Sequence, residues 1–94
     1  MTDRKMYIDK FADKLKQFDD DIEKLENKTR NKLDVVKVKL DEGIKEIQQK
    51  RKNAGDKFSE LKESSNDAWK ELKKGLEKVE NDLQTSIRKA KNKF

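Results

Sequence analysis

The chain has 94 residues, of which 48% are charged and only 31% are hydrophobic, so the apolar core of an ordinary globular domain is excluded. It contains no cysteine and no histidine, which excludes disulfides, thiolate chemistry and the usual near-neutral acid–base group. Such a composition fits either long helices or disorder, and the absence of proline favours helices.

The first two thirds of the chain carry an apolar stripe with the spacing of a helix. From Ile8 to Leu25 its members are three and four residues apart, which is the a/d seam of a coiled coil. The seam becomes polar at Thr29 and Lys32, and then resumes at Val36. We therefore predict one long helix over about residues 3–63 that hides the seam by self-association.

The segment LDVVKVKL, residues 33–40, interrupts this simple pattern. Val35 and Val38 fall beside the stripe rather than on it. On a helix they would make a second apolar face, so we interpret them as contacts with a second neighbouring helix. An isolated strand here would have no partner elsewhere in the chain.

The stretch SSND, Ser64 to Asp67, contains residues that favour helix starts over helix interiors. Ser64 and Asp67 form an approximate capping box, with Ser65 as the other candidate cap. We therefore expect a tight turn at about 63–66 and a second helix over about 65–93. Asn66, the remaining residue of the stretch, also belongs to the predicted turn.

Two alternatives to this helical hairpin stay open. The rhythm of the stripe continues through the SSND stretch, which would allow a single continuous helix in a coiled coil. A further bend in ENKTRNK, residues 26–32, would instead give a three-helix bundle. We prefer self-association as a dimer, because this segment has neither glycine nor proline to make a sharp turn.

The apolar stripe is the main candidate interaction surface of this all-α fold. We predict that it mediates self-association, with a partner helix as a second occupant. The predicted stripe consists of Ile8, Phe11, Leu15, Phe18, Ile22, Leu25, Val36, Leu40, Ile44, Ile47, Phe58, Leu61, Leu72, Leu76, Val79, Leu83 and Ile87.

The net charge of +5 is concentrated near the C-terminal end of the sequence. No acidic residue follows Asp82, while Arg88, Lys89, Lys91 and Lys93 do. Basic residues there complement the dipole of a helix end, and they are also candidate contacts for an anionic membrane or nucleic acid.

YIDKFADKLKQFDDDIEKLE and the later SSNDAWKELKKGLEKVENDL resemble a group of small bacterial coiled-coil proteins of uncharacterised role. The specific part is DAWKELKKGLE, residues 67–77. Asn66 stands where the group has glycine, and Phe18 and the pair Val79–Glu80 stand where it often has tryptophan. The resemblance implies an all-helical, soluble bacterial protein and no particular activity.

No pattern in the sequence indicates catalysis, a cofactor or a metal. The run Asp19 to Asp21 cannot converge on one ion, because neighbouring helical residues point about 100° apart. Trp69 is interpreted as packing over the turn. The sequence therefore predicts a non-enzymatic, cytoplasmic structural or interaction protein, with an anionic-surface binder and a stress-protective helical protein as the alternatives.

Overall fold

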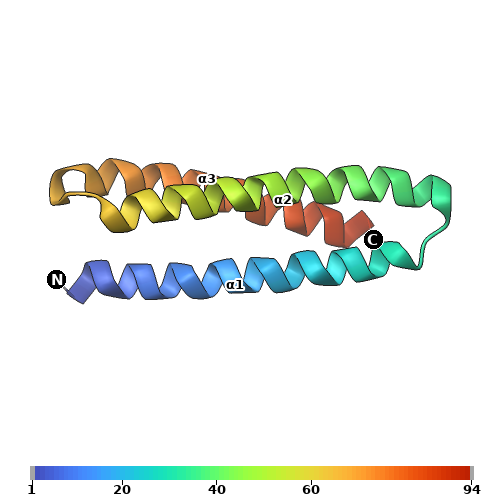
Figure 1. Ribbon diagram of the computed structural model, residues 1–94, viewed down its shortest axis with the longest axis horizontal. Coiled ribbons are helices and arrows are strands. Elements are labelled where there is room, and N and C mark those ends of the chain that lie inside the picture. Colours follow the sequence, from blue (N-terminus) through green and yellow to red (C-terminus); the bar gives the residue numbers. More distant parts are fainter. Residues whose placement is uncertain (1, 94) are drawn as a thin grey trace.

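Three antiparallel helices of similar length form the molecule (Figure 1). They are α1 (Thr2–Arg30), α2 (Asp34–Glu63) and α3 (Asn66–Lys93). The computed structural model describes residues 2–93, which form a rod of 51 × 18 × 18 Å. Helix α2 packs against both of its neighbours, whereas α1 and α3 touch each other more sparsely.

The all-α prediction is confirmed, and the predicted turn lies between Glu63 and Asn66. The predicted long helix over 3–63 is wrong, because the chain leaves the helix after Arg30 and re-enters it at Asp34. A straight helix would have held the N-terminal seam away from the rest of the chain and in water. Folding back buries it, and this apolar burial outweighs the lost helical residues.

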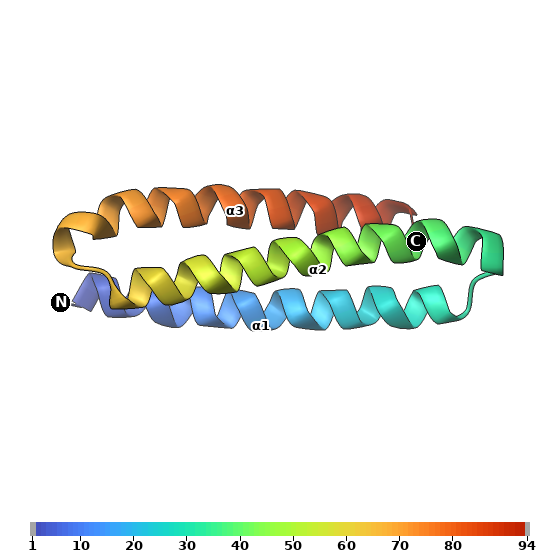
Figure 2. The same cartoon turned by 45° about the horizontal axis from the view of Figure 1, so that its top comes forward.

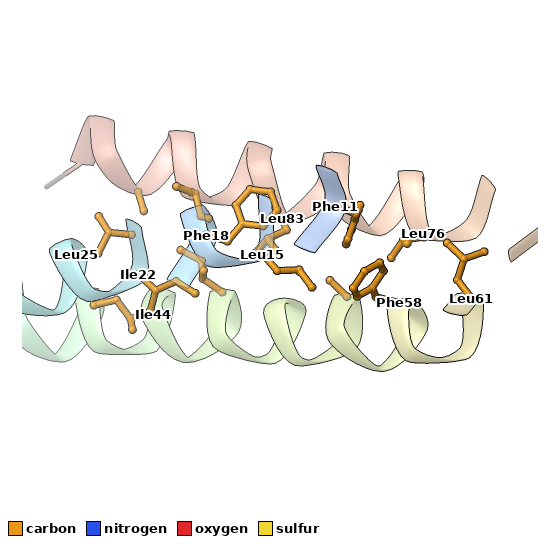
Figure 3. Close-up of a cluster of buried hydrophobic side chains, with 14 residues drawn as sticks. Phe11, Leu15, Phe18, Ile22, Leu25, Ile44, Phe58, Leu61, Leu76 and Leu83 are labelled. Carbon is orange, nitrogen blue, oxygen red and sulfur yellow. The ribbon is translucent and has the colours of Figure 1, made fainter. Parts of the chain in front are cut away.

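The apolar stripe is buried inside one chain (Figure 3). Phe11 and Phe58 meet between α1 and α2, with their ring centroids 5.0 Å apart. Three leucines, Leu61, Leu76 and Leu83, have no exposed surface at all. The other buried stripe members are Leu15, Phe18, Ile22, Leu25, Leu40, Ile44, Ile47 and Ile87.

The remaining stripe residues differ in their environment. Ile8, Leu72 and Val79 are partly buried against the core, whereas Val36 is 46% exposed. The surface predicted to join two chains is thus occupied by the chain's own helices. A stripe-mediated dimer would require the bundle to open, because its apolar side chains are already out of water.

The α2–α3 turn is held by its own serine side chains and by an arginine from the start of α1. The Ser65 hydroxyl accepts a hydrogen bond from the Ala68 backbone N–H at 3.4 Å, so Ser65 rather than Ser64 caps α3. The Ser64 hydroxyl instead donates to the Leu61 carbonyl oxygen at 2.7 Å. From α1, Arg4 donates to the Ser64 carbonyl oxygen at 2.6 Å and to the Asn66 side chain at 3.2 Å.

Ion pairs on the surface tie each pair of helices together. Arg51 of α2 pairs with Asp19 of α1 at 2.8 Å, and Lys50 pairs with Asp82 of α3 at 3.2 Å. Between α1 and α3, Lys14 pairs with Glu80 and Lys91 with Asp21. Exposed pairs of this kind stabilise a fold by about 0–1 kcal/mol each, so their main effect is to favour one helix register.

Candidate functional site at the end of the bundle

The turn between α1 and α2 is short and has little local support. Helix α1 finishes with backbone hydrogen bonds from Asn31 to Lys28 and from Lys32 to Thr29, which tighten its last turn. Leu33 then adopts an extended conformation, with φ −63° and ψ 149°. It occupies the N-cap of α2 and offers no side-chain hydrogen bond to the helix.

An exposed aliphatic surface surrounds this turn. Leu33 and Val35 are each 81% exposed, Val38 is 59% exposed and Val36 is 46% exposed. We call these four residues the aliphatic tip. Among the described residues, the only other exposed large hydrophobic side chain is Met6. It belongs to the N-terminal part of α1, which begins at the opposite end of the rod (Figure 1). The apolar surface left in water is therefore concentrated in one place.

Basic residues flank the aliphatic tip on both helices. We call them the basic ring: Lys28, Arg30, Lys32, Lys37 and Lys39. Asp34 is the only acidic residue from Lys28 to Lys39. Within residues 2–93, none of the ion pairs involves a member of the basic ring. The positive charge at this end is thus free to attract an external anion.

The structure divides the predicted C-terminal basic cluster between two faces of α3. Lys89 and Lys93 line a shallow surface groove together with Lys39 of the basic ring. Arg88 and Lys91 face α1 instead, where Lys91 is paired with Asp21 at 3.2 Å. Only two of the four predicted contacts therefore share a groove with a member of the basic ring, and Glu46 and Asp82 line that groove as well.

The opposite end of the rod contains a cluster of aromatic and basic side chains. The Tyr7 ring lies edge-on to Trp69, with centroids 5.8 Å apart, and Lys73 lies 4.8 Å from the Tyr7 ring centroid. Burial, reinforced by the charges of Glu77 and Glu80, raises the pKa of Tyr7 to about 12. A phenol so hard to ionise is not a catalytic base, and we interpret the cluster as packing, as the sequence predicts for Trp69.

The described residues contain no group of three or more acidic side chains placed to hold a metal ion, and Asp19 pairs with Arg51 instead. None of the helices in residues 2–93 has a stretch long and apolar enough to cross a bilayer. The groove between α1 and α3 has Phe18 and Ile87 in its lining, but both side chains are buried.

Sequence reasoning missed the aliphatic tip because it assigned two of its residues to a helix contact. Helix α2 does contact two neighbours, but the side chains of Val35 and Val38 are largely exposed to solvent. The available signal was the alternation of valine with lysine off the main stripe. That alternation places apolar and charged side chains together on the outside of the helix.

No family model matches the sequence, and neither the curated proteins nor the solved structures include a match. The resemblance of residues 67–77 to small bacterial coiled-coil proteins therefore stays a prediction.

Proposed function

We propose that this protein is a non-enzymatic interaction module, a helical rod that binds a partner surface through its aliphatic tip. The observation that carries the proposal is the concentration of exposed apolar side chains at residues 33–38. Concentrated apolar exposure is typical of interaction sites, whereas single exposed hydrophobic residues are ordinary. The self-association predicted from the stripe is not part of the proposal, because the stripe is buried within one chain.

The residue at position 33 supports the same conclusion. Leu33 stands at the N-cap of α2, where leucine is among the least favourable residues and serine among the best. Its side chain is also 81% exposed and contributes little to the core. A residue that benefits neither the helix start nor the packing is the kind of local inconsistency that marks a functional position.

A dye-binding experiment tests this proposal. A tip-serine variant carries Leu33→Ser, Val35→Ser and Val38→Ser, and we expect it to bind much less anilinonaphthalene sulfonate than the native protein. Serine and valine have similar helix propensities, and the Leu33→Ser change would add a cap, so the thermal midpoint should stay level or rise. Unchanged dye emission, or a midpoint lowered by more than about 10 °C, would contradict the proposal.

The matched control removes the other exposed hydrophobic side chain. Met6→Ser changes a residue that is 50% exposed at the opposite end of the rod. We expect this variant to retain most of the dye emission. Equal losses in both variants would show that the dye reports general apolar exposure and not a binding surface at the aliphatic tip.

A further inference from the structure

We propose that the occupant of the aliphatic tip is an anionic lipid surface, onto which the rod docks end-on. This inference rests on the proposed function and names its partner. Leu33, Val35 and Val38 enter the outer edge of the hydrocarbon, and the basic ring lies at the level of the lipid phosphates.

The first argument is charge complementarity. The basic ring contributes five positive charges close to the aliphatic tip, and Asp34 is the only acidic residue within residues 28–39. Glu26 and Asp41 line a surface groove with Arg30 and Lys37 but form no ion pair with them, so this end keeps a net positive charge.

Lys89 and Lys93 of α3 line a surface groove with Lys39, but Glu46 and Asp82 line the same groove, so the basic ring supplies most of the positive charge at this end. Lysine side chains reach anionic headgroups while their methylene stems cover apolar surface, so an aliphatic patch framed by lysines fits a membrane interface.

The second argument is the position of the aliphatic tip in the fold. Figures 1 and 2 both show that α3 ends before the α1–α2 turn, so the turn projects beyond the rest of the bundle. The tip can therefore enter a flat surface without opening the core. The first turn of α2 points the same way and has no side-chain cap, which adds a partial positive charge suited to phosphate.

A second copy of the chain fits this surface less well. A second copy that met this one tip to tip would bring two basic rings together, each with five positive charges. Like charges brought together in this way repel each other, so covering the aliphatic side chains with a second copy is opposed electrostatically.

Nucleic acid also fits less well than lipid. Proteins that bind single strands present aromatic side chains on which bases stack, and residues 28–39 contain none. Duplex binding relies on phosphate contacts from basic residues and would leave the exposed aliphatic side chains without a role. The basic ring alone would suit either polyanion, but the aliphatic tip suits only hydrocarbon.

The test is sedimentation of the full chain with lipid vesicles. The probes are vesicles of phosphatidylcholine alone and vesicles containing one third phosphatidylglycerol. We expect binding to the anionic vesicles at least about tenfold tighter than to the neutral ones, and weakening as salt is raised. Equal binding to both vesicle types, or no binding to the anionic type, would overturn the proposal.

Two variants separate the two components of the surface. The tip-serine variant removes the aliphatic component, and a ring-neutral variant with Lys32→Gln, Lys37→Gln and Lys39→Gln removes positive charge. We expect each to weaken binding to anionic vesicles by roughly tenfold or more. Circular dichroism confirms that each variant remains helical, so a loss of binding is not a loss of folding.

The matched control removes the same amount of charge at the far end of the rod. Lys57→Gln, Lys70→Gln and Lys74→Gln change side chains away from the tip, and we expect native binding to anionic vesicles. If this variant binds as weakly as the ring-neutral variant, net charge alone drives the binding and the site is not at the tip.

The remaining outcomes identify other occupants. Tighter binding to duplex DNA than to vesicles, unaffected by the tip-serine changes, would overturn the proposal in favour of nucleic acid. A dimer in light scattering that the tip-serine changes dissociate would overturn it in favour of a second copy. A third outcome combines two results: the tip-serine variant loses dye binding, but the native protein binds no vesicles. This outcome would overturn the proposal of a lipid partner, while the proposed interaction module would remain supported.

Discussion

The guanidinium carbon of Arg4 lies 4.4 Å from the centroid of the Trp69 ring, which joins the start of α1 to the start of α3. The same guanidinium donates to the carbonyl oxygens of Leu61, Lys62 and Ser64. These oxygens belong to the C-terminal end of α2, where the helix dipole is negative. One side chain therefore completes a helix end and fixes the third helix against the first.

Arg4→Ala should lower the free energy of unfolding by about 1–3 kcal/mol, because it leaves several helix-end carbonyls without a charged donor. Chemical denaturation monitored by circular dichroism measures the change. Lys5→Ala is the control, since Lys5 is the exposed neighbour on the same helix turn. Equal effects in the two variants would show that the contacts of Arg4 add nothing to stability.

Tyr7→Phe should stabilise the protein and reduce its sensitivity to alkali. The Tyr7 hydroxyl is buried and has no hydrogen-bond partner within residues 2–93, so its removal relieves an unsatisfied polar group. Burial, together with Glu77 and Glu80, raises the pKa of Tyr7 from 10.0 to about 12, which means that folding favours the neutral phenol.

The sign of the alkaline effect follows from linkage. The raised pKa of Tyr7 leaves the free energy of unfolding unchanged below pH 10 and lowers it as the pH rises from 10 to about 12. The reason is that the unfolded state releases the phenolic proton first. Denaturation of both proteins across this window measures the difference, since the two proteins differ only at this residue. The expectation would be contradicted if the native protein and the Tyr7→Phe variant lost stability in parallel over this pH range.

Two leucines should lose very different amounts of stability in response to the same substitution. Leu83 has no exposed surface, so Leu83→Ala should cost about 2–5 kcal/mol through lost burial and a residual cavity. Leu33 is 81% exposed, so Leu33→Ala should change stability by about 0.5 kcal/mol or less. Thermal and chemical unfolding measure both, and a large cost for Leu33→Ala would mean that the aliphatic tip packs against the fold.

Replacing two helical glycines should stabilise the bundle. A Cβ added at Gly43 or Gly75 would meet no atom within 4 Å, so each Gly→Ala change should add about 0.5–1 kcal/mol through helix propensity. Gly55 is the comparison, because its added Cβ would lie 2.9 Å from a guanidinium nitrogen of Arg51. Gly55→Ala should gain less, since Arg51 must move and its pair with Asp19 weakens.

Periodicity was sufficient to predict that the chain is helical and to predict most of its buried side chains. The stripe from Phe11 to Leu25 is buried as a set, and the capping residues near Ser65 mark the start of α3. These features are local, because the three- and four-residue spacing and the preference of serine for helix starts do not depend on the rest of the fold.

The break at residues 31–33 could not be predicted in the same way. Its causes are not local, since no glycine or proline marks it and Leu33 is a poor cap. Helix α1 ends because folding back buries apolar side chains that lie far from the break in sequence, such as Phe11 against Phe58. Thr29 shows the same effect, because it interrupts the seam in sequence yet is only 1% exposed and donates its hydroxyl to the Leu25 carbonyl oxygen.

The placement of Trp69 has a practical consequence for spectroscopy. It is the only tryptophan in the chain, and it lies at the end of the rod away from the α1–α2 turn. Its emission should therefore change on unfolding and stay constant when the aliphatic tip binds a partner. One fluorescence experiment can thus follow the two events separately, with tryptophan emission for unfolding and a label near residue 35 for binding.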